Sequence, residues 1–117
     1  MWQGFEGRQF PRIQTDCRIY ITKDTHHQPI TARTENIGAG GICVLLDEPL
    51  PKLSMVNVKL DIDDGGQPIS CVAQVVWTVE RKEFNAKKKL HDIGMSFIDL
   101  DDASKRRIEE IIKTTTN

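Results

Sequence analysis

Residues 55–79 read MVNVKLDIDDGGQPISCVAQVVWTV and carry the clearest structural signal in the chain. Every second residue of the first half is aliphatic: Val56, Val58, Leu60 and Ile62. This period of two is typical of a strand with one buried face, and the run 63–66 that follows is typical of a hairpin turn. The return segment has the same period: Cys71, Ala73, Val75 and Trp77. The stretch therefore predicts an antiparallel hairpin, with Trp77 among its core residues.

Further short strands are expected on both sides of this hairpin, at 17–21, 30–37, 42–46 and 92–98. Glycine, proline or polar runs separate them. The end of the chain differs, because Asp101 and Asp102 open a helix whose apolar stripe includes Ile108 and Ile112. Many short strands followed by one helix predict an all-β fold, a small six-stranded antiparallel β-barrel with a C-terminal α-helix.

The chain of 117 residues is long enough for one core, so we expect a single domain. Residues 1–15 carry glycines and a proline but no apolar period, which predicts a flexible N-terminal arm. The β-barrel is expected over 16–99 and the helix over 100–114.

Composition argues against several classes of function. The formal net charge is −1 and only seven residues are aromatic, which disfavours DNA or RNA as a partner. No apolar run approaches the roughly 20 residues that membrane insertion needs. Three cysteines without CxxC spacing, and no signal-peptide core, predict a reducing compartment and a cytoplasmic protein. We find no nucleophile–base pair and no metal-ligand spacing, so we expect neither an enzyme nor a metal protein.

Two short motifs supply the chemistry that an anionic nucleotide needs. Arg8 and Arg12 form an R-x-x-x-R pattern on the arm, and Asn36 is followed by Gly38 and Gly41 between two expected strands. A guanidinium matches phosphate oxygens and the Hoogsteen edge of guanine. An asparagine both donates and accepts, and glycines let a ligand approach backbone N–H groups. Each motif also has a plainer interpretation, as solvated arginines and as a tight turn.

In order and spacing, these motifs resemble the paired signature of bacterial PilZ domains, R-x-x-x-R followed by D/N-x-S-x-x-G. The segments 75–77 and 91–100 are similar to the closing strands of that family, and the likeness covers essentially the whole chain. The resemblance implies a receptor for cyclic di-GMP (c-di-GMP), with no other cofactor. Arg8 and Arg12 would contact guanine and phosphate, Asn36 would bind guanine, and Gly41 would permit close approach. It also implies a regulated protein partner in motility, attachment or exopolysaccharide production.

The chain departs from this signature at Gly38, which stands where the family usually has serine. A hydrogen bond to a charged group contributes about 1.5–3 kcal/mol, so the missing hydroxyl predicts binding roughly tenfold to hundredfold weaker unless another donor replaces it. Gly7 stands where many relatives carry a further arginine. The resemblance therefore does not decide whether the chain binds one ligand molecule or an intercalated pair. The alternative function is a PilZ-like protein-interaction adaptor that does not bind the nucleotide.

Overall fold

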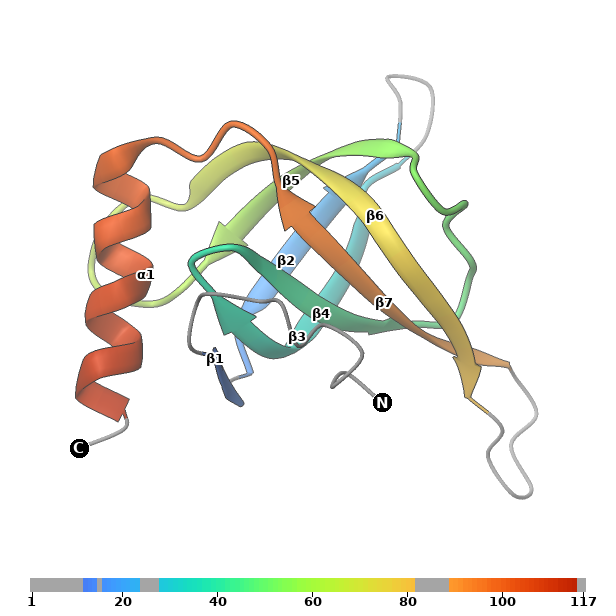
Figure 1. Ribbon diagram of the computed structural model, residues 1–117, viewed down its shortest axis with the longest axis horizontal. Helices are drawn as coiled ribbons and strands as arrows, with labels where there is room; N and C mark the ends of the chain where they lie inside the picture. The colour runs from blue at the N-terminus through green and yellow to red at the C-terminus, as the bar shows by residue number, and fades with distance from the viewer. Residues whose placement is uncertain (1–11, 15, 24–27, 82–88, 116–117) are drawn as a thin grey trace.

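The described residues of the chain form a sheet of seven strands followed by one helix (Figure 1). The computed structural model describes residues 12–14, 16–23, 28–81 and 89–115. The elements in chain order are β1 (Arg12–Gln14), β2 (Arg18–Thr22), β3 (Ile30–Gly38), β4 (Gly41–Leu46), β5 (Met55–Asp61), β6 (Ile69–Arg81), β7 (Leu90–Phe97) and α1 (Asp102–Thr115).

Six of these strands close into a barrel. β3, β2, β5, β6, β7 and β4 are neighbours in that order, and β4 pairs again with β3. Every pairing is antiparallel. Closure leaves the barrel without free edges, which is how small all-β domains avoid edge-to-edge association. The predicted six-stranded barrel with a C-terminal helix is confirmed.

β1 is a seventh strand that lies outside this closed ring. β2 pairs with β3 over residues 30–33 of β3, and β1 takes the same edge over residues 36–38. Where one partner gives way to the other, Cys17 and Thr34 join the two segments. Thr34 N donates to Cys17 O at 2.8 Å, and Cys17 N donates to Thr34 Oγ1 at 3.0 Å.

We predicted residues 1–15 as an irregular arm, but 12–14 form a strand. The pairing partner of β1 is the backbone of β3, more than twenty residues away, so the local sequence of the arm does not reveal it. Residues 1–11 and 15 lie outside the described part of the chain.

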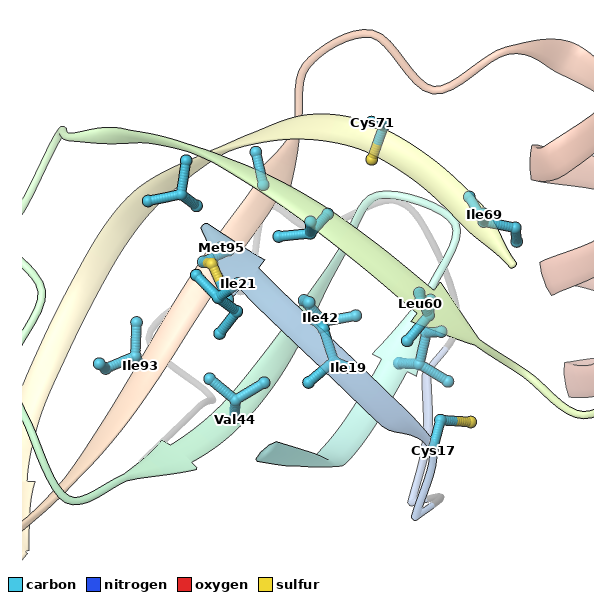
Figure 2. Close-up of a cluster of buried hydrophobic side chains, with 14 of the residues drawn as sticks. Cys17, Ile19, Ile21, Ile42, Val44, Leu60, Ile69, Cys71, Ile93 and Met95 are labelled. Carbon is cyan, nitrogen blue, oxygen red and sulfur yellow. The ribbon is translucent and has the colours of Figure 1, made fainter. Parts of the chain in front are cut away.

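The core fills the inside of the barrel with aliphatic side chains from every strand (Figure 2). Ile19, Ile42, Leu60 and Ile93 are fully buried there. α1 lies against one end of the barrel, where it contacts β1 and β3 (Figure 1). Its residues Ile108 and Ile112 join the core.

The start of α1 follows from its sequence. Ser104 N donates to Asp101 Oδ1 at 2.7 Å, so Asp101 caps the helix and satisfies one of its unpaired N–H groups. In the part of the chain that the structure describes, no helix is long and apolar enough to cross a membrane.

Candidate functional site

The two sequence motifs meet where β1 pairs with β3. Arg12 stands opposite Gly38, Ile13 opposite Ile37, and Gln14 opposite Asn36. The backbone of the second arginine of R-x-x-x-R therefore runs beside the backbone of the glycine-rich motif. Only the backbone of Arg12 is described, and Arg8 lies outside the described residues.

A bulge in β3 turns Asn36 toward the outer face of the barrel. Thr34 pairs with Val44, and Asn36 pairs with the next residue of β4, Cys43, so Glu35 is an extra residue. Thr34 and Ile37 are both buried toward the core. In a strand without the extra residue, Asn36 would share the face of Thr34 and point inward. The bulge reverses this alternation and leaves Asn36 half-buried on the outside.

A second bulge turns Trp77 outward in the same way. Val75 pairs with Met95, and Trp77 pairs with Gly94, so Val76 is extra. Val75 and Met95 lie in the core, whereas Trp77 is half-buried and lies outside the core cluster. A Cβ added at Gly94 would overlap the indole of Trp77, so the ring packs directly against this glycine. Our prediction of Trp77 as a core residue is wrong, because the bulge breaks the period of two after Val75.

Strand register aligns these residues in one row across the outer face. Asn36 pairs with Cys43, Cys43 with Gly94, and Gly94 with Trp77. The row crosses β3, β4, β7 and β6 and has a carboxamide at one end and an indole at the other. An amide that can hydrogen-bond and a ring that can stack are the groups that recognise a nucleobase. We call these four residues the outer row.

Gly41 has a structural role beside any role toward a ligand. It opens β4 opposite Ser96, and a Cβ at this position would overlap the carbonyl oxygen of Met95 in β7. The backbones of β4 and β7 therefore approach too closely for a side chain. This role accounts for a glycine at position 41 without invoking the ligand, and the two roles are compatible.

An ion-pair network lies next to the outer row. Arg81 Nη2 donates to Glu35 Oε2 at 2.9 Å and to Asp92 Oδ1 at 2.8 Å, and Arg81 Nε donates to Asp92 Oδ2 at 3.1 Å. Cys43 Sγ lies 3.6 Å from Glu35 Oε1. Partial burial and the neighbouring Asp92 carboxylate raise the pKa of Glu35, against the opposing effect of Arg81. Hydrogen bonds to Asp92 and Glu35 raise the pKa of Arg81.

The same network is the closest approach to a metal site among the described residues. Ligand atoms of Glu35, Cys43 and Asp92 lie within 4.8 Å of one another. The guanidinium of Arg81 already supplies a positive charge to both carboxylates, so we interpret the group as an ion-pair network. All three cysteines are buried. Burial also raises the pKa of the Cys71 thiol to about 11, which disfavours the thiolate that a nucleophile requires.

The fold is a closed antiparallel barrel with an accessory strand and a terminal helix. The sequence model of the PilZ domain matches residues 6–114, so the chain belongs to the PilZ domain family. A search of curated protein sequences found no match.

Several solved structures share this fold. The inhibitor of motility MotI/DgrA from Bacillus subtilis has 17% identity and a TM-score of 0.72, with 94% of this chain and 51% of that chain covered. The PilZ domain of YcgR from Escherichia coli, solved with c-di-GMP, has 19% identity and a TM-score of 0.71, with 92% and 89% covered. The K. pneumonia MrkH–c-di-GMP complex has 17% identity and a TM-score of 0.75, with 93% and 52% covered. The chain spans about half the length of the MotI and MrkH chains.

Sequence reasoning identified Asn36, Gly38 and Gly41 but missed the other groups at this face. Trp77 gave a signal, since it is an aromatic residue near the closing strands, but its period assigned it to the core. Arg81 lies beyond the hairpin predicted over 55–79, and neither Arg81 nor Glu35 was singled out. No local pattern links Glu35 to Arg81, which are 46 residues apart.

Proposed function

We propose that the chain is a c-di-GMP receptor whose ligand binds on the outer face of the barrel, over β1, the β3–β4 turn and the outer row. The observation that supports this most directly is the pairing of Arg12 with Gly38, which joins the two motifs. Membership of the PilZ family supports the same ligand. So do relatives of the same fold whose structures contain c-di-GMP.

In this proposal each site residue has a distinct role. Arg8 and Arg12 donate to phosphate oxygens and to the Hoogsteen edge of guanine. Asn36 hydrogen-bonds a guanine base, and the backbone at Gly38 and Gly41 permits close approach of the ligand. We add Trp77 to this set, because a half-buried indole in line with Asn36 offers a stacking surface for a guanine ring.

The proposed output is regulation of a partner protein. Binding changes the surface that the domain presents to that partner. Motility, attachment or exopolysaccharide production are the processes that we propose for the output, and the protein acts without catalysis of its own. The chain covers only about half of the longer relatives, so the shared fold does not identify the partner. A regulated partner is therefore a proposal.

Isothermal titration calorimetry with c-di-GMP tests the ligand. We expect the wild type to bind, and Arg12→Ala or Asn36→Ala to bind roughly tenfold to hundredfold more weakly, because each loses a hydrogen bond to a charged or polar group. Arg18→Ala is the matched control for charge, since Arg18 is exposed on β2 away from the outer row. Asn57→Ala, exposed on β5, is the control for the amide.

A wild type that gives no heat at tens of micromolar protein defeats the proposal. If Gly38→Ser then creates binding where none existed, the native chain is better described as a protein-interaction adaptor. The molar ratio of the titration decides between one ligand and an intercalated pair.

A further inference from the structure

The bulge at Glu35 places Asn36 on the outer face of the barrel. A contact that stabilises the bulge therefore also stabilises this orientation of Asn36. An extra residue in one strand lacks a partner in the ladder and bends the strand locally. If β3 slipped into regular pairing by one residue, every following side chain would change face, and Asn36 would turn into the core. On the other edge of β3, β2 pairs with residues 30–33 and β1 with only three residues beyond the bulge, 36–38.

The side chain of Glu35 is contacted from three other strands, of which only β4 pairs directly with β3. Within the described residues, Cys43 of β4, Asp92 of β7 and Arg81 of β6 face its carboxylate. Arg81 is the only cation in this group, and its guanidinium contacts both carboxylates at once. Without it, two carboxylates would face each other at the bulge and repel. Only about a third of each of the Glu35 and Arg81 side chains is exposed, at 34% and 36%.

Arg81 also belongs to the strand that carries the second bulge. It lies four residues after Trp77 in β6, on the same run that turns the indole outward. The contact between Arg81 and Glu35 therefore connects β6, which carries Trp77, to the bulge in β3 that places Asn36 on the outer face. Asp92 of β7 accepts two further hydrogen bonds from the Arg81 guanidinium and fixes its orientation.

We infer that Arg81 is a positioning residue for ligand binding: by holding Glu35 in the β3 bulge, it keeps Asn36 on the outer face in line with Trp77. The ligand in this inference rests on the proposed function, whereas the positioning of Asn36 does not. The planar fork of arginine suits this role, because it can contact two carboxylates in fixed directions. A lysine ammonium lacks that geometry, so the role depends on more than charge.

The test compares three variants by calorimetry and by ¹H–¹⁵N NMR of the ligand-free protein. Arg81→Met keeps the length and apolar stem but removes the guanidinium. We expect its affinity for c-di-GMP to fall at least tenfold and the side-chain amide signals of Asn36 to shift. Arg81→Lys should give an intermediate affinity. Arg33→Met is the matched control, because Arg33 lies in β3, two residues before Glu35, and forms an exposed ion pair with Asp16. It should leave affinity within twofold and the Asn36 signals in place.

Wild-type affinity and unchanged Asn36 signals in Arg81→Met would overturn the inference. A lower melting temperature with neither change would also overturn it, because Arg81 would then be structural only. If Arg81→Met does not fold, the decision passes to Arg81→Lys, in which wild-type binding overturns the inference. If the wild type binds no c-di-GMP, the proposed function fails, and the NMR shift alone decides whether Arg81 positions Asn36.

Discussion

At the scale of single residues, Asp64 links the β5–β6 hairpin to α1. Its carboxylate accepts from Arg107 Nε at 2.8 Å, from Arg107 Nη2 at 2.5 Å and from Gly66 N at 3.0 Å. The hydrogen bond from Arg107 is the main reason that the pKa of Asp64 falls to about 2 from its ordinary value of 3.8. A carboxyl with a lower pKa in the folded state stabilises the protein above its unfolded pKa. That contribution is lost as the pH falls through 3.8 toward about 2.

Asp64→Asn should therefore destabilise the protein in a way that depends on pH. Because the pair is partly exposed to solvent, we expect a loss of only about 0.5–1 kcal/mol at pH 6. The gap to the wild type should shrink by roughly half near pH 3, since the wild-type carboxylate then gains protons on unfolding. Urea unfolding of both proteins between pH 6 and pH 3 measures this gap. Asp63→Asn, an exposed position in the same loop, is the matched control, and a constant gap for Asp64→Asn contradicts the assignment.

At the scale of elements, α1 stabilises the barrel by covering one end of it. Ile108 is fully buried in the common core, while its neighbour Glu109 is exposed. Ile108→Ala should cost about 2–5 kcal/mol, because it removes buried aliphatic groups and leaves a cavity between the helix and the barrel. Glu109→Ala is the matched control on the same helix and should change stability by less than about 0.5 kcal/mol. Urea unfolding at neutral pH measures both, and a loss below about 1 kcal/mol for Ile108→Ala means that α1 does not seal the core.

The same elements show what local sequence can and cannot predict. The strands expected over 55–62 and 69–79 correspond to the observed Met55–Asp61 and Ile69–Arg81, because alternation of apolar residues is a local pattern. The bulges at Glu35 and Val76 were not, because a bulge exists only relative to a partner strand. Asn36 was still singled out as a candidate, because it stands in the sequence motif itself. Trp77 was assigned to the wrong face, because its orientation depends on the bulge before it.

At the scale of the whole molecule, the scaffold and the candidate site are built from different pairings. The ring closes through β3 and β4, so the barrel is complete without β1. β1 adds the second arginine of R-x-x-x-R to the edge of β3 and contributes Ile13 to the core. The order of strands in the ring could not be read from the sequence, because pairing of distant segments leaves no local pattern.

Removing residues 1–14 should therefore separate folding from binding. We expect the shortened chain to keep its barrel, because every pairing within the ring remains. It should lose about 1.5–3 kcal/mol of stability with the burial of Ile13, and it should not bind c-di-GMP. Circular dichroism, urea unfolding and calorimetry measure the three outcomes. The full-length variant Arg8→Ala/Arg12→Ala keeps the backbone of β1, so it should match the wild type in stability while losing the ligand. If the shortened chain does not fold, β1 is required for the scaffold. If the shortened chain folds and still binds c-di-GMP, Arg8 and Arg12 are not part of the site.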